Sequence, residues 1–141
     1  KAQIRHEAKR SAHRVAILAF GSVVPHAVAA GETLDATVVN MRFVKPLDVA
    51  LLAELARTHD AFVTVEENVV MGGAGSGVAE ALAELGLVVP MLHLGLPDRF
   101  LDHGDPAQIF ADCGLDARGI AAAVEVRFPA RRDDAAAKPA A

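Results

Sequence analysis

The chain has 141 residues, 52% of them hydrophobic and 23% charged, which is typical of one folded domain and excludes intrinsic disorder over most of its length. Its formal net charge of −4 argues against a general nucleic-acid binder, which usually carries a basic face, and no apolar run approaches the roughly 20 residues needed to span a bilayer. The single cysteine, Cys113, cannot form an internal disulfide and indicates a reducing compartment such as the cytoplasm.

The first elements along the chain alternate between strand and helix. Residues 1–13 are basic and alternate weakly between apolar and polar, so we expect a linker or an edge strand there. The continuous apolar run at residues 15–20 is typical of a strand buried on both faces, and we expect it at the centre of the sheet. Ser22 is the expected N-cap of a helix that ends near Gly31. β-branched residues at 36–43 predict a second strand.

The same alternation continues to the end of the chain. The further predicted elements are a helix up to about residue 59, a third buried strand at 61–65, a helix over 78–85, a fourth strand at 88–94, and helices over 105–114 and 116–128. Pro90 indicates that the fourth strand lies near an edge of the sheet. Residues 129–141 lack large apolar side chains and are expected to be a disordered tail. The pattern predicts an α/β domain with a mostly parallel sheet and helices on both faces.

A glycine-rich loop at residues 72–77 precedes the third predicted helix. Such a turn can bind phosphate through free backbone N–H groups and the positive end of the helix dipole. However, no Gly-Lys-Ser/Thr sequence follows, and Val78 stands where a G-x-G-x-x-G fingerprint requires its last glycine. We therefore expect an architectural role for the loop, with an independent phosphate- or nucleotide-binding module as the alternative function.

Glu66 and Glu67 end the third predicted strand at the carboxyl edge of the sheet, where open α/β sheets place their binding sites. Adjacent residues of a strand point to opposite faces, so the two side chains are not expected to act as a facing carboxylate pair. We expect structural roles, with one of the two carboxylates buried and hydrogen-bonded to the glycine-rich loop.

Other titratable residues do not form a complete catalytic set. The loop after the fourth strand carries four of them, Asp98, Arg99, Asp102 and His103. They could supply a base and its orienting partner, but nothing provides a nucleophile, so loop salt bridges or a contact between chains are expected. The six histidines lack metal-ligand spacing, and no metal site is expected. Cys113 is expected to be a small apolar filler, and His26 and His59 are expected on helix surfaces.

Three segments carry a family resemblance through their order and spacing: NMRFVKPLD at 40–48, VTVEENVVMGGAGS at 63–76 and LGLPDRFLDHG at 94–104. Together they resemble the C-terminal domain of the 1-deoxy-D-xylulose-5-phosphate synthase family, which belongs to the transketolase-like thiamine diphosphate enzymes. The resemblance covers about residues 14–128, which we take as the domain. It implies a three-layer α/β/α fold whose five-stranded mixed sheet has the order 1-3-2-4-5 and an antiparallel first strand. Residues 1–13 would then supply that strand.

The resemblance also implies a function for the parent protein. Enzymes of this family condense pyruvate with glyceraldehyde 3-phosphate to form 1-deoxy-D-xylulose 5-phosphate and CO₂, for isoprenoid and thiamine biosynthesis. They use thiamine diphosphate and Mg²⁺, and we expect a cytoplasmic homodimer. The family's cofactor and substrate contacts lie in other domains, so no catalytic, cofactor-binding or metal-binding residue is carried over to this chain.

The chain is therefore expected to be a structural, dimer-supporting transferase domain without activity of its own. Its expected partners are the rest of the parent chain and the dimer mate, with no nucleic acid and no membrane. The start at Lys1 rather than at Met also favours a piece of a longer protein.

An alternative parent is the thiamine-binding β subunit of a 2-oxoacid dehydrogenase complex, which would bind an acyltransferase. Its C-terminal domain shares the R-x-x-x-P-L-D pattern found at residues 42–48. The pattern L-P-D-x-F-x-x-H-G at residues 96–104 points away from it.

Overall fold

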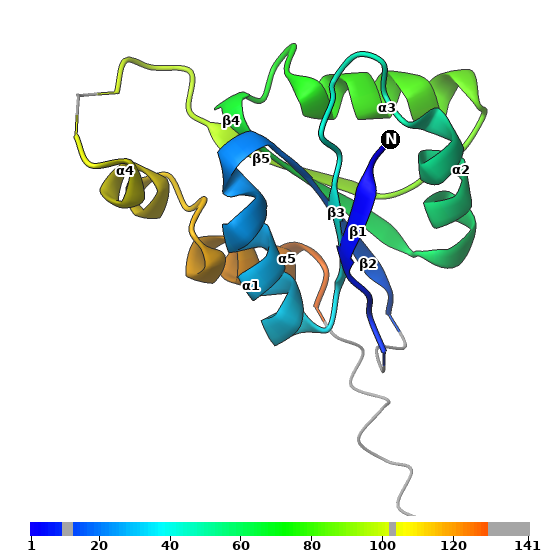
Figure 1. Cartoon of the computed structure of the whole chain (residues 1–141), viewed down its shortest axis with the longest axis horizontal. Helices are drawn as coiled ribbons and strands as arrows, with labels where there is room; N and C mark the ends of the chain where they lie inside the picture. Colours follow the sequence, from blue (N-terminus) through cyan, green and yellow to red (C-terminus); the bar gives the residue numbers. More distant parts are fainter. Residues whose placement is uncertain (10–12, 102–103, 130–141) are drawn as a thin grey trace, which may run out of the picture.

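The structure, a computed structural model, describes residues 1–9, 13–101 and 104–129. Its centre is a five-stranded sheet with the order β1-β3-β2-β4-β5 (Figure 1). The strands are β1 (Gln3–His6), β2 (Val15–Phe20), β3 (Thr37–Asn40), β4 (Ala61–Val69) and β5 (Met91–Leu96). β1 runs antiparallel to β3, and the other neighbours are parallel. The expected mixed sheet, with its order and antiparallel first strand, is confirmed. The predicted tail lies outside the described residues apart from Pro129.

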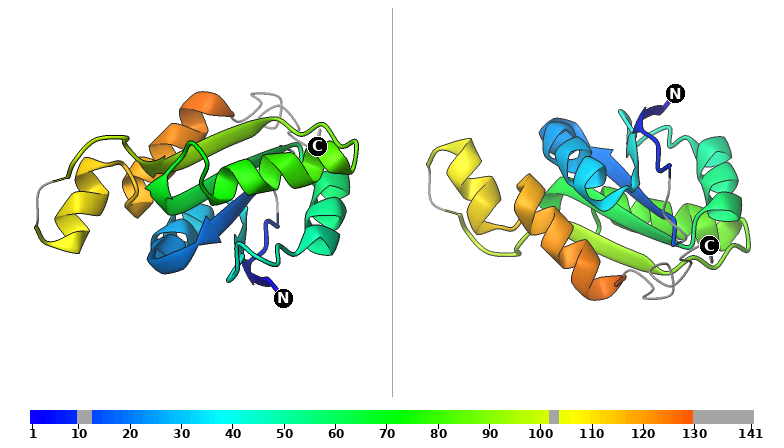
Figure 2. Two further views of the ribbon diagram at one scale, coloured as in Figure 1. Left: turned by 90° about the horizontal axis from the view of Figure 1, so that it is seen from above. Right: turned by 90° about the horizontal axis from the view of Figure 1, so that it is seen from below.

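Helices cover both faces of the sheet and complete the three layers (Figure 2). The helices are α1 (Val24–Leu34), α2 (Val49–Thr58), α3 (Ala74–Glu84), α4 (Pro106–Asp112) and α5 (Ala117–Arg127), and a short 3₁₀ turn (Gly21–Val23) precedes α1. α1 and α5 pack on one face, which we call the α1/α5 face, and α2 and α3 pack on the other, the α2/α3 face. α4 lies beside α1, where the rings of Phe110 and His26 meet edge-on with their centroids 5.5 Å apart.

β2 is the central strand, as its apolar run predicts. All six of its residues are buried, and β3 and β4 flank it on either side. Ile17 and Ala19 belong to the core of the α1/α5 face, whereas Ala16 and Leu18 belong to the core of the α2/α3 face. This alternation shows why a strand between two helix layers has no polar position.

The N-terminal segment is held to the sheet by polar contacts as well as by the β1 ladder. The Ala2 N–H donates to Asp48 Oδ2 at 3.0 Å, and the Ala8 N–H donates to Thr37 Oγ1 at 3.2 Å. Asp48 also caps α2 by accepting from the Leu51 N–H at 3.3 Å. These bonds attach β1 to the elements that follow β2 in the chain.

Several predicted boundaries are wrong. α1 continues past Gly31 to Leu34, and Asp35, in the left-handed conformation with a φ of 52°, is its C-cap. Gly31 does not end the helix but lets it approach β3 closely, since a side chain there would collide with Val38. Ser22 does not cap α1 with its side chain. β3 ends at Asn40, three residues before the predicted end. β5 begins at Met91, after Pro90, although its edge position is confirmed.

Candidate functional site

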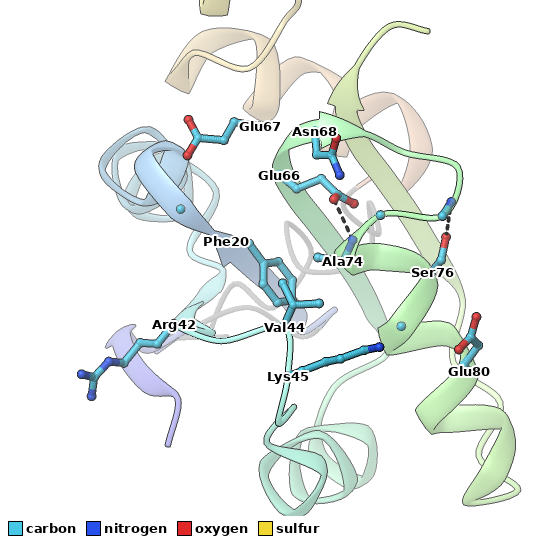
Figure 3. Close-up of a pocket in the computed structure, with 14 residues that line it drawn as sticks. Phe20, Arg42, Val44, Lys45, Glu66, Glu67, Asn68, Ala74, Ser76 and Glu80 are labelled. Carbon is cyan, nitrogen blue, oxygen red and sulfur yellow. Dashed lines mark hydrogen bonds between the residues drawn. The ribbon is translucent and has the colours of Figure 1, made fainter.

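The candidate site is a cleft of about 590 Å³ at the carboxyl edge of the sheet, between the ends of β2 and β4 (Figure 3). The connections that leave β2 and β4 pass to opposite faces of the sheet, since α1 and α3 lie on different faces. Open α/β sheets bind their ligands at such a topological switch point. The walls of the cleft include the glycine-rich loop, Lys45 of the β3–α2 connection, and the two glutamates Glu66 and Glu67.

Glu66 caps the start of α3 from inside the fold. Its side chain is buried, with 3% of the residue exposed. Oε2 accepts a hydrogen bond from the Ala74 N–H at 2.7 Å, and Oε1 accepts one from the Gly75 N–H at 2.9 Å. The negative carboxylate also lies at the positive end of the helix dipole, which favours the same arrangement. The expectation that one glutamate is buried and bonded to the glycine-rich loop is confirmed.

Glu67 serves the other face of the sheet in the same way. Its Oε1 accepts from the Ser22 N–H at 2.9 Å, and the Ser22 hydroxyl donates to its Oε2. This contact lies at the 3₁₀ turn that leads into α1, where Gly21 has a φ of 82° and any side chain would collide with the carboxylate. Glu66 and Glu67 point apart in Figure 3, so the expectation that they do not face one another is confirmed. Each carboxylate occupies the start of a helical segment on its own side.

The glycine-rich loop uses its remaining amides largely within itself. The Gly72 N–H donates to Ser76 Oγ at 3.1 Å, the Gly73 N–H to the Val70 carbonyl at 3.2 Å, and the Gly77 N–H to the Gly73 carbonyl at 3.4 Å. A phosphate site at a helix start needs such donors to be free and to point at the ligand. The loop therefore has the bonding pattern expected of an architectural element.

Two cations border the cleft but point in different directions. Lys45 extends across the cleft toward α3, whereas Arg42 points away from it (Figure 3). Arg42 has a φ of 62°, and its N–H donates to Asn40 Oδ1 at 3.0 Å. Its guanidinium lies 5.6 Å from the ring centroid of Phe43, within cation–π range. The cleft thus has one inward-pointing lysine against three wall carboxylates, of Glu66, Glu67 and Glu80.

A polar cluster beneath the loop was not foreseen from the sequence. Thr64 Oγ1 and His93 Nδ1 are hydrogen-bonded at 2.7 Å, which ties β4 to β5. A Cβ atom at Gly75 would lie 2.6 Å from His93 Nδ1, so α3 can pack over this pair only with glycine at that position. The one signal in the sequence was Thr64, a polar residue inside the otherwise apolar run at 61–65, which indicates that a polar partner lies nearby. The cluster joins β4, β5 and α3.

The other candidate residues lie apart from the cleft. Asp98 and Arg99 are exposed in the loop after β5, and Asp102 and His103 lie outside the described residues. Cys113 packs against the core of the α1/α5 face, as expected of an apolar filler. Within the described residues, no group of three or more His, Cys, Asp or Glu side chains is arranged to hold a metal ion.

His59 is not the helix-surface residue that the sequence predicted. It is half-buried at the end of α2, where Nε2 bonds with Thr37 Oγ1 at 2.9 Å and Nδ1 with the Leu55 carbonyl at 3.2 Å. Burial lowers the pKa of the imidazole below its ordinary value of about 6.5, although the bond to the Leu55 carbonyl acts in the opposite direction.

This pKa shift predicts a pH dependence of stability. The contribution of neutral His59 is fully present above pH ~6.5 and is lost as the pH falls below that value, because the unfolded chain then takes up the proton first. We expect His59→Gln to reduce the loss of unfolding free energy between pH ~7.5 and ~5.5. Urea unfolding of the unmodified chain and of His59→Gln at both pH values measures this loss. Equal losses in the two proteins would contradict the prediction.

The family model described as "Transketolase, C-terminal domain" matches residues 5–120. The chain belongs to this family. A solved structure described as "Split gene transketolase, inactive beta4 tetramer", where beta4 refers to that protein's subunits and not to strand β4, superposes on this chain with a TM-score of 0.78. The two sequences are 35% identical, and the match covers 94% of this chain and 42% of that one. The resemblance found in the sequence is confirmed at the level of fold and family.

Similar curated proteins are 1-deoxy-D-xylulose-5-phosphate synthases. The protein of Ralstonia pickettii is 64% identical and that of Paraburkholderia phymatum 60% identical, each over 129 residues, or 91% of this chain and 20% of theirs. The protein of Thioalkalivibrio sulfidiphilus is 58% identical over 99% of this chain and 22% of its own length. The chain thus spans about a fifth of the length of these relatives. None of the helices in the described parts of the chain has the length and apolar character required to cross a bilayer.

Proposed function

We propose that this chain is the structural, dimer-supporting C-terminal domain of a thiamine diphosphate-dependent transferase. The parent enzyme would condense pyruvate with glyceraldehyde 3-phosphate to give 1-deoxy-D-xylulose 5-phosphate and CO₂. The proposal is supported by the identity of 58–64% to synthases over nearly the whole chain. The domain extends over residues 14–128, and the antiparallel edge strand β1 (Gln3–His6) precedes it. The parent acts as a cytoplasmic homodimer in isoprenoid and thiamine biosynthesis.

The observation that carries the structural role is the pair of glutamates at the switch point. Glu66 and Glu67 place carboxylates where a diphosphate would have to approach the starts of two helical segments. A diphosphate would meet like charge and occupied N–H groups there. These residues therefore do not fit the diphosphate group of thiamine diphosphate. We propose that the parent enzyme binds thiamine diphosphate and Mg²⁺ in other domains, and that this chain has no synthase activity alone.

The two alternatives have less support. An independent phosphate-binding module would need free amides in the glycine-rich loop, and those of Ala74 and Gly75 are bonded to Glu66. A 2-oxoacid dehydrogenase β subunit as the parent rests on one short pattern at residues 42–48, whereas the similarity to synthases extends over the chain.

Calorimetry with thiamine diphosphate in the presence of Mg²⁺ tests the proposal. We expect no saturable heat with the 141-residue chain, and saturable binding together with product formation for the full-length synthase that contains it. The full-length enzyme is the control for cofactor quality. Saturable binding to the short chain would contradict the assignment of the cofactor site to other domains, and an inactive full-length protein would contradict the synthase assignment.

A further inference from the structure

A series of hydrogen bonds runs from the chain after β1, through β3, to the end of α2. The Ala8 N–H donates to Thr37 Oγ1 at 3.2 Å, and Thr37 Oγ1 bonds with His59 Nε2 at 2.9 Å. His59 Nδ1 lies 3.2 Å from the Leu55 carbonyl. Only 1% of Thr37 is exposed, so water cannot take the place of its partners. The Thr37 hydroxyl therefore couples the attachment of Ala8 to the state of the imidazole.

The groups around His59 determine which ring nitrogen carries the hydrogen when the ring is neutral. The Leu55 carbonyl can only accept, and the Thr58 hydroxyl, 3.0 Å from Nδ1, already donates to a carbonyl of α2. The hydrogen therefore lies on Nδ1, and Nε2 accepts from the Thr37 hydroxyl. With the hydrogen on Nε2 instead, the hydroxyl hydrogen of Thr37 would lack an acceptor, since its described partners are the Ala8 N–H and the ring.

We propose that His59 is a pH-sensitive switch for the chain after β1, and that protonation of its ring releases Ala8 from Thr37 while the domain stays folded. A proton on Nε2 turns this nitrogen from an acceptor into a donor aimed at the Thr37 hydroxyl. The hydroxyl hydrogen must then turn away from the ring, either toward the Ala8 N–H, which it repels, or toward a position without an acceptor. A buried donor without a partner is costly, whereas the half-buried Ala8 can bond with water, so release of Ala8 is the less costly change.

His6, a second histidine that attaches the same segment, does not have this property. Its Nδ1 lies 2.8 Å from the Ala36 carbonyl, and a carbonyl accepts from a neutral and from a protonated ring alike. The next attachment joins the Lys9 N–H to Asp35 Oδ1 at 3.0 Å in an exposed place, where water competes for both groups. Protonation of the histidines therefore leaves β1 on the sheet, and the chain that follows it loses its attachment to β3.

The surroundings of the His59 ring determine the pH of the release. Burial is the largest effect and lowers the pKa of the imidazole, so the release lies on the acidic side of pH ~6.5. The charged side chains around the ring come from the chain after β1, the chain before β2, and α2 with the residue after it: Glu7, Arg14, Glu54 and Asp60. Arg14 disfavours the protonated ring, whereas Glu7 and Asp60 favour it, and β3 contributes no charged side chain. Behind Asp60 lies His13, with 3.6 Å between Nδ1 and Oδ2.

Amide exchange and ring titration of the 141-residue chain, followed by NMR between pH ~7.5 and ~5.5, test the proposal. We expect the protection factor of the Ala8 amide to fall by about three- to tenfold, with the midpoint at which the His59 ring titrates. The amide of Ile17 in the centre of β2 should keep its protection, because the domain stays folded. An unchanged Ala8 amide, or loss of protection at both amides together, would overturn the proposal.

Three variants separate His59 from the other titratable groups. The side chain of His59→Gln can bond with Thr37 but takes up no proton, so Ala8 should stay protected at both pH values. Thr37→Val keeps a similar shape without the hydroxyl and should leave Ala8 unprotected at both, whereas His6→Gln should respond to pH as the unmodified chain does. A pH response of Ala8 that persists in folded His59→Gln, or disappears in folded His6→Gln, would contradict the assignment to His59. These measurements need neither cofactor nor substrate, so their outcome is independent of the proposed function.

Discussion

Replacement of Ile17 by alanine is expected to lower the free energy of unfolding by about 2–5 kcal/mol, the range found for large-to-small changes in well-packed cores. Ile17 lies in the middle of β2 with no exposed surface, between β3 and β4 and under the helices of the α1/α5 face. The rigid neighbours on both sides cannot collapse into the space left by the removed atoms, so a cavity term adds to the lost transfer free energy.

Urea unfolding followed by circular dichroism measures the effect of Ile17→Ala. Ile4→Ala on the outer strand β1 is the matched control, since Ile4 is 49% exposed, and its effect should stay within about 0.5 kcal/mol. A loss below about 1 kcal/mol at Ile17 would contradict the central position of β2.

Replacement of Glu66 by alanine is expected to cost about 2–4 kcal/mol, because two N–H groups at the start of α3 lose a charged acceptor in a buried place. Glu67→Ala is the comparison within the same strand. Glu67 is exposed, and water can replace its carboxylate at Ser22, so a loss of about 1 kcal/mol or less is expected.

Equilibrium unfolding and amide exchange of Ala74 and Gly75 together test this second expectation. Glu66→Ala should destabilise the protein and also speed exchange at both amides, whereas Glu67→Ala should leave them unchanged. If the two variants lose the same stability and α3 exchanges normally, Glu66 does not hold the helix start.

The strands at the centre of the sheet could be predicted from the sequence, because burial on both faces requires an apolar residue at nearly every position. The runs at 15–20 and 61–65 contain almost no polar residue, a pattern that few other local structures produce. Pro90 likewise indicated that the strand following it, β5, lies at an edge of the sheet. These signals are local, and each depends on a few consecutive residues.

The start of α3 could not be predicted from local sequence. The sequence Gly-Gly-Ala-Gly-Ser-Gly has poor helix propensity and predicted a loop up to Val78, yet the helix begins at Ala74. Glu66 supplies the acceptors for its first turn from another element, and no local pattern encodes that contact. The environment of His59 depends in the same way on Thr37, 22 residues earlier in the chain.

The capping of α3 by Glu66 also disfavours the binding of free phosphate compounds at the start of this helix. Ala74 lies only eight positions after Glu66, so the carboxylate competes for the helix start as a tethered ligand. Short tethers give effective concentrations on the order of millimolar or above. A free sugar phosphate or diphosphate would have to outcompete this internal anion and then lie beside it in the same cleft. The start of α3 is therefore poorly suited to retain a free phosphate group.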